Sequence, residues 1–125
     1  MFKNSFDDLY LYHNDRCSKS REIKVFLDEK KLNYNIIDYL NKPIDKKFFE
    51  KMILKLENRP EDLIRVNEKI YKALNKNEKA LTIENIPNLI IKHPILLQRP
   101  ILVKLKNNEV IKSLICRPIE LVKTF

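Results

Sequence analysis

The chain has 125 residues and a formal net charge of +8, from 25 basic and 17 acidic side chains. A chain of this length is most simply one domain with one hydrophobic core, here spanning residues 1–125. It contains no glycine, which excludes the glycine-rich phosphate loop and the dinucleotide-binding fingerprint. The basic residues are interspersed with acidic ones, as on solvated helix faces, so we expect no nucleic-acid binding despite the charge.

Neither a membrane span nor a disulfide framework is expected. The sequence has no run of roughly 18 apolar residues, the length that a transmembrane helix needs. Its first residues contain no long apolar stretch before the acids Asp7 and Asp8, so they do not resemble a secretory signal. Two cysteines, Cys17 and Cys116, are too few for a disulfide-stapled fold. We therefore expect a cytoplasmic protein with two thiols.

The beginning of the chain predicts a strand, a helix and a second strand. Large apolar and aromatic residues alternate over 8–13 and predict the first strand. Helical spacing predicts an amphipathic helix from Ser18 or Ser20 as N-cap to about Lys31, and a strand over 34–40 follows. This order is typical of a parallel strand pair with a right-handed crossover.

The middle of the chain is predicted to be helical. Asp45 is placed to cap the first of these helices. A later one is expected to begin at Asn85, so that Pro87 falls in its first turn, and His93 before Pro94 is expected to end it. The predicted helices cover residues 45–56, 60–65, 70–74 and 85–92.

The last third predicts two strands, 101–105 and 110–114, joined at Asn107-Asn108, and a closing helix over 119–125. Asparagine suits that turn because it tolerates left-handed backbone better than most residues. The whole order is the thioredoxin-like layout. We therefore predict an α/β fold of three layers, with a mixed sheet of about four strands and a helical insertion at about 44–92.

Cys17 is a candidate nucleophile because of its position and its neighbours. It stands between the first predicted strand and the first predicted helix, among the basic residues Arg16, Lys19 and Arg21. A helix N-terminus and adjacent cations both stabilise a thiolate over a thiol. The same pattern also fits a buried structural cysteine with solvent-facing basic residues, so the local sequence leaves both interpretations open.

Any redox chemistry at Cys17 uses a single thiol. A dithiol oxidoreductase needs Cys-x-x-Cys, and Ser20 occupies the second position. His13 is either a base or hydrogen-bond partner of the sulfur, or a strand-end residue that orders the loop. No second histidine or cysteine stands at ligand spacing, so we expect no metal site. Cys116 adjoins an apolar strand and is expected to fill the core.

Four motifs occur along the chain. Tyr12-His13-Asn14 is followed by Cys17, Ser20 and Arg21, and three arginine-containing segments come later: residues 59–65, 93–101 and 116–118. In this order the motifs resemble those of the glutaredoxin-coupled arsenate reductases, the ArsC family of thioredoxin-fold proteins. The likeness extends over residues 10–123, so it does not depend on one short pattern.

The resemblance implies a role for each motif residue. It makes Cys17 the nucleophile and three arginines an oxyanion clamp, and guanidinium groups suit that task because their paired donors match oxyanion edges. Pro100 resembles the cis-proline that faces the catalytic cysteine in thioredoxin folds. The implied site comprises Cys17, the substrate-binding residues Arg65, Arg99 and Arg117, and the supporting residues His13, Asn14, Ser20 and Pro100.

The resemblance also implies a reaction. The Cys17 thiolate attacks arsenate, or a similar oxyanion, to give a thiol-arsenate adduct. Glutathione then attacks, glutaredoxin removes the resulting mixed disulfide, and arsenite leaves. The protein would be a monomer without a bound cofactor, with glutathione as reducing co-substrate and glutaredoxin as partner.

Two departures from the family pattern leave alternatives open. Ser18-Lys19 replaces the usual Gly-Thr after the cysteine, and Asp15 stands where proline is common. The Asp15 carboxylate is expected to oppose thiolate formation unless Arg16 pairs with it. The alternatives are an ArsC-like oxidoreductase of unknown substrate, a regulator that binds RNA polymerase like the Spx proteins of the same fold, and a polyanion-binding module.

Overall fold

The computed structural model describes residues 7–125. They contain a mixed four-stranded sheet with the strand order β2-β1-β3-β4. Strand β1 pairs in parallel with β2 and antiparallel with β3, which in turn pairs antiparallel with β4. The strands are β1 Asp7–Tyr12, β2 Asn35–Ile37, β3 Ile101–Lys106 and β4 Glu109–Ile115. The predicted mixed sheet and the parallel first pair are thus confirmed.

Seven helices surround this sheet in the described part of the chain. The α-helices are α1 Ser18–Glu29, α2 Lys46–Leu54, α3 Lys69–Ala73 and α4 Ile86–Lys92. The 3-10 helices are η1 Pro60–Leu63, η2 Pro94–Leu96 and η3 Ile119–Thr124. As predicted, Asp45 caps α2 by accepting a hydrogen bond from Phe48 N, and Asn85 is the N-cap of α4. No described helix has the length and apolar character needed to span a membrane.

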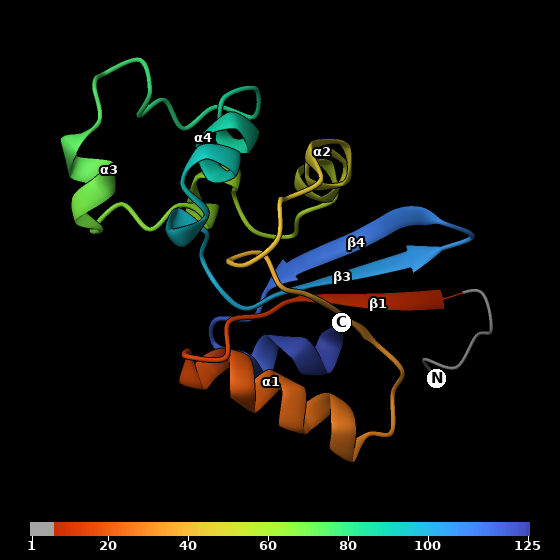
Figure 1. The fold of residues 1–125 in the computed structure, drawn as a ribbon. Helices are drawn as coiled ribbons and strands as arrows, with labels where there is room; N and C mark the ends of the chain where they lie inside the picture. The colour runs from red at the N-terminus through yellow and green to blue at the C-terminus, as the bar shows by residue number, and fades with distance from the viewer. Residues whose placement is uncertain (1–6) are drawn as a thin grey trace.

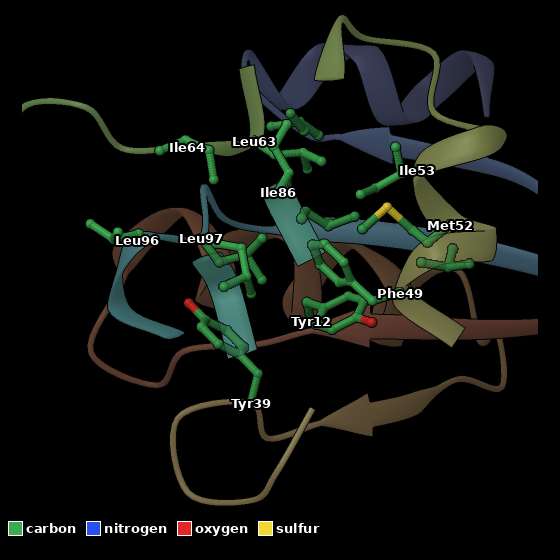
Figure 2. Packing of buried hydrophobic residues seen from close by; sticks show 14 of the residues in the cluster. Tyr12, Tyr39, Phe49, Met52, Ile53, Leu63, Ile64, Ile86, Leu96 and Leu97 are labelled. Carbon is green, nitrogen blue, oxygen red and sulfur yellow. The ribbon is translucent and has the colours of Figure 1, made fainter. Parts of the chain in front are cut away.

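The elements form three layers, because each face of the sheet buries its own set of apolar side chains. Helices α1 and η3 cover one face, and α2 and α4 cover the other (Figure 1). Alternate residues of a strand point to opposite faces, so Leu9 and Leu11 pack toward α1 whereas Tyr12 packs toward α2. Figure 2 shows part of the second cluster, in which the Tyr12 ring lies beside Phe49 of α2 and beside Tyr39.

The structure differs from the prediction at the ends of two elements and at two 3-10 helices. Helix α1 ends at Glu29 rather than Lys31, because Lys31 adopts a left-handed conformation with φ 57°. Strand β2 stops at Ile37, since the Asp38 carbonyl accepts hydrogen bonds from Asn41 N and Lys42 N and thereby closes a turn. The predicted closing helix is the 3-10 helix η3, and η2 was not predicted at all.

The hairpin turn follows the prediction. Asn107 and Asn108 both have positive φ, at 52° and 65°. Asparagine therefore fills the two left-handed positions that glycine commonly occupies in such a turn.

The helical segment between β2 and β3 is fastened to the sheet by polar contacts. Ser113 of β4 is fully buried, and its hydroxyl donates to the Met52 carbonyl at 2.6 Å. Ile64 and Leu97 form an antiparallel bridge beside η1, and Arg65 N donates to the Leu96 carbonyl at 2.8 Å. These bonds hold Arg65 against the segment that leads to Arg99.

Candidate active site

The sheet topology brings three distant parts of the chain to one edge. Strand β1 ends at Tyr12, whose partner in β3 is Ile101, and Ile101 in turn pairs with Ile115 at the end of β4. The loop after β1, the segment before β3 and the segment after β4 therefore meet. Their residues include Cys17, Arg99 and Arg117.

Cys17 is the N-cap of α1, with extended backbone at φ −100° and ψ 120°. The helix has 12 residues, and its first turn contains no acidic side chain, so its unpaired N–H groups and positive dipole end face the sulfur without an internal counter-charge. Asn14 shapes the loop before it: its carbonyl accepts from Cys17 N and its side-chain oxygen accepts from Arg16 N, both at 2.9 Å.

The Cys17 thiol is acidic despite its burial. The residue is 6% exposed, and burial alone would raise its pKa. Nearby donors outweigh this effect and lower the pKa to about 7: they are Ser20 N–H, the Arg99 side chain, the Ser20 hydroxyl, which does not reach hydrogen-bond geometry, and Lys19 N–H. Arg117 Nη2 also donates to the sulfur, at 3.6 Å. A substantial fraction of Cys17 is therefore thiolate at neutral pH.

Arg99 and Arg117 are braced against each other. Arg117 Nε donates to the Arg99 carbonyl, and the Arg99–Pro100 peptide bond is cis, as the resemblance implies. Arg99 is partly buried, and its Nε is buried without a hydrogen-bond partner. Two guanidinium groups, those of Arg99 and Arg117, thus lie at the sulfur. The Nε–H donor of Arg99 is unused.

Arg65 lies near this centre but is engaged elsewhere. Its Nη1 forms an ion pair with Glu68 Oε2 at 3.3 Å, and both side chains are about one-third exposed or less. Its charge acts on the buried phenol of Tyr39, as do the charges of Arg99 and Cys17. The structure therefore brings Arg99 and Arg117 to the sulfur, and places Arg65 close by with Glu68 as its partner.

Asp15 pairs with His13 rather than with Arg16. His13 Nε2 donates to Asp15 Oδ1 at 2.6 Å. The His13 side chain is 5% exposed and that of Asp15 is 91% exposed. Arg21 Nη1 donates to the Asp15 carbonyl at 2.7 Å. Of the two open readings of His13, this geometry favours the residue that orders the loop.

Cys116 fills the core, as predicted. It is fully buried and its S–H donates to the Leu114 carbonyl at 3.7 Å. Burial raises its pKa to about 12, so it stays a thiol. Residues 7–125 contain no group of three or more histidine, cysteine or acidic side chains that could hold a metal ion.

Unpartnered polar atoms gather around Cys17. The described residues contain five buried side-chain nitrogen or oxygen atoms without a hydrogen-bond partner, although buried polar groups are normally paired. Three of them belong to residues whose electrostatics are linked to Cys17: Ser20 and Arg99 lower the pKa of Cys17, and the charge of Cys17 raises the pKa of Tyr39. The five atoms are Ser20 Oγ, Arg99 Nε, Tyr39 Oη, His13 Nδ1 and His93 Nε2. Each of the first three can donate a hydrogen bond, so the site is built to receive an acceptor.

Tyr39 is the member of this group that sequence reasoning missed. Its place in a run of apolar and aromatic residues indicated only a strand position. No local signal separated it from Tyr34, which lies in the same segment. The only cue was its place just beyond the carboxyl end of a strand parallel to β1, where such strands bring their loops together.

A cavity of about 490 Å³ lies next to Arg117. Arg117 and Gln98 line it, together with Arg59, the N-cap of η1, and Asp62 of η1. Both charge signs are therefore present on its wall. The cavity gives a second molecule a place beside the guanidinium that contacts Cys17.

Comparisons with known proteins agree with the fold and with the family resemblance. The sequence model described as the ArsC family matches residues 12–125. The "Arsenate reductase" of Neisseria meningitidis serogroup A is 32% identical over 117 residues, which cover 90% of this chain and 93% of the relative. The solved structure of a "Putative arsenate reductase from Yersinia pestis" has a TM-score of 0.77 and 30% identity, and covers 94% of this chain and 100% of that one.

A relative with a different description is also similar. The "Global transcriptional regulator Spx" of Streptococcus pneumoniae (strain ATCC BAA-255 / R6) is 25% identical over 100 residues, which cover 80% of this chain and 75% of the relative. The family match extends from the last residue of β1 to the C-terminal residue, and the fold is the thioredoxin-like fold of the solved arsenate reductase structures. On this ground the chain belongs to the ArsC family.

Proposed function

We propose that this protein is an arsenate reductase whose single nucleophile is Cys17. The observation that carries the proposal is the set of unpaired donors around an acidic thiol: Arg99 Nε and Ser20 Oγ are buried without partners beside a cysteine with a pKa of about 7. A tetrahedral oxyanion accepts several hydrogen bonds at once, so it would satisfy these donors and present its central atom to the sulfur.

The chemistry follows from one thiol with no resolving partner. The Cys17 thiolate attacks As(V), an As–S bond forms, and one arsenate oxygen leaves as water after protonation. A glutathione thiolate then bonds to the Cys17 sulfur. The As–S electron pair passes to arsenic, which leaves as As(III) arsenite, and the two sulfurs become the oxidised mixed disulfide. A glutaredoxin thiol attacks that disulfide and returns Cys17 to its thiolate.

The surroundings of Cys17 support an external reductant. Cys116 is fully buried with a raised pKa, so it is poorly suited to resolve a disulfide. The cavity beside Arg117 has room for a thiol co-substrate, and its mixed charges suit a zwitterion such as glutathione. The cavity and the buried second thiol together favour reduction by a small external thiol.

A second candidate is a regulator of the Spx kind, favoured by the similarity to that protein. A cysteine pair at 17 and 20 would be the natural redox sensor of such a protein, and Ser20 removes it. Recovery of RNA polymerase with the tagged protein, together with no arsenite production, would support the regulator and oppose the reductase.

The reductase activity itself is directly measurable. With arsenate, glutathione and glutaredoxin, the protein should produce arsenite, and Cys17→Ser should reduce production to the rate without protein because no nucleophile remains. Cys116→Ser is the matched control and should retain most of the activity, since Cys116 lies in the core. A Cys17→Ser variant that keeps full activity would refute the proposal.

The reactivity of Cys17 should depend on pH in a defined way. In a Cys116→Ala background, alkylation should rise with pH around a midpoint near 7, because only the thiolate reacts and the folded-state pKa is about 7. Arg99→Gln removes a donor to the charged form, so the midpoint should move toward higher pH. A midpoint at the ordinary thiol value of ~8.5 in the Cys116→Ala protein would contradict the proposed site.

Glu68 should compete with the substrate for Arg65. Glu68→Gln removes the ion pair at 3.3 Å, so the KM for arsenate should fall about two- to fivefold, in line with the energies of partly exposed ion pairs. Glu78→Gln is a matched control, because Glu78 pairs with Lys92 at the same distance on another part of the surface. Equal effects of the two variants would indicate a change in overall charge, with no role for Arg65.

A further inference from the structure

Tyr39 is held in place next to the loop that carries Cys17. His13 N donates to the Ile37 carbonyl at 3.1 Å, so the chain that leaves β2 runs beside the loop that leaves β1. The Tyr39 side chain is 1% exposed. Its ring packs edge-on against Tyr12, with centroids 6.2 Å apart and an interplanar angle of 60°. The ring is therefore fixed by the core, and its hydroxyl has a defined position.

That hydroxyl has no hydrogen-bond partner among the described residues. A buried tyrosine usually pairs its O–H, because an unpaired polar group in the interior is costly. The Asn14 side chain comes near the phenol oxygen without meeting hydrogen-bond geometry. The fold thus fully buries a donor at this point without using it.

The hydroxyl points toward the chain segment that leads to Arg99 (Figure 2). Figure 2 shows the Tyr39 oxygen pointing toward the segment of Leu96 and Leu97, which leads to Arg99. Burial raises the pKa of Tyr39, and the charge of Cys17 raises it further. The positive charges of Arg99 and Arg65 offset this rise only in part. The phenol therefore keeps its proton at neutral pH and remains a donor.

We propose that the Tyr39 hydroxyl donates a hydrogen bond to the tetrahedral oxyanion bound at Cys17 and Arg99. It would act as a substrate-binding residue alongside the arginines. The proposal deepens the proposed function and rests on it only for the class of ligand. A neutral donor adds a contact to the oxyanion without adding positive charge, and the rigid ring provides it with little loss of side-chain freedom.

Tyr39→Phe tests the contact, with sulfate and phosphate as unreactive probes and arsenate as substrate. The variant should bind all three anions about tenfold more weakly, since hydrogen bonds to charged groups contribute strongly. Its thermal midpoint without anion should be equal to or above that of the parent, because the substitution removes an unpaired buried oxygen. A purely structural role would instead lower the thermal midpoint.

Tyr12→Phe is the matched control. Tyr12 is as buried as Tyr39, and the two rings pack against each other. The Tyr12 hydroxyl points away from that of Tyr39 in Figure 2. Burial and the charge of Asp45 raise the pKa of Tyr12, and no group near Cys17 contributes to that rise. Its anion affinity should match that of the parent protein. Equal affinity of Tyr39→Phe and the parent, or equal losses in both variants, would overturn the proposal.

The same experiment separates this proposal from the proposed function. A parent protein that binds sulfate and phosphate but makes no arsenite would refute the reductase, and weaker binding by Tyr39→Phe would then still support the contact. A parent protein that binds none of the three anions would overturn both.

Discussion

Cys17 is buried, and its acidity depends on nearby hydrogen-bond donors that offset that burial. A thiolate in an apolar interior is costly, yet here the sulfur receives donors from two backbone N–H groups at the start of α1, from Ser20 and from Arg99, and its pKa is about 7. Arg117 adds a contact at 3.6 Å. If these donors were absent, the same burial would keep Cys17 protonated, as it does Cys116, whose pKa is raised to about 12.

The fold brings these donors together from distant parts of the sequence. The ends of β1 and β4 and the start of β3 meet at one sheet edge, so residues 17, 99 and 117 become neighbours. The Ile64–Leu97 bridge fixes the helical insertion against the segment before Arg99. Unpaired buried donors are rare in folded proteins, and their concentration at this edge indicates a ligand site for an acceptor.

Much of the fold follows from sequence patterns. Alternation defined β1, Asp45 and Asn85 marked the starts of α2 and α4, and Asn107-Asn108 defined the hairpin. The helical middle was harder because it consists of short turns whose ends are set by tertiary bonds, such as those of η2. Lys31 carried no sign that it would take positive φ, since lysine has no special preference for that conformation.

The site was predictable only in part. Cys17 and its helix could be inferred from local residues, whereas the arginines came from the likeness to a family. Two details depend on side-chain geometry that the spacing of residues in the sequence does not predict. Asp15 pairs with His13 rather than with Arg16, and Arg65 pairs with Glu68. Tyr39 was hidden because its role depends on the direction of one hydroxyl in the folded core.

A crystal structure with bound arsenate or sulfate is the most direct measurement of the central claim. We expect the anion beside the Cys17 sulfur, in contact with the guanidinium groups of Arg99 and Arg117, with Arg65 released from Glu68 to join them. A crystal that binds the anion only at other places, with Arg65 still on Glu68 and Arg99 Nε still unpaired, would contradict the claim that this edge of the sheet is an oxyanion site.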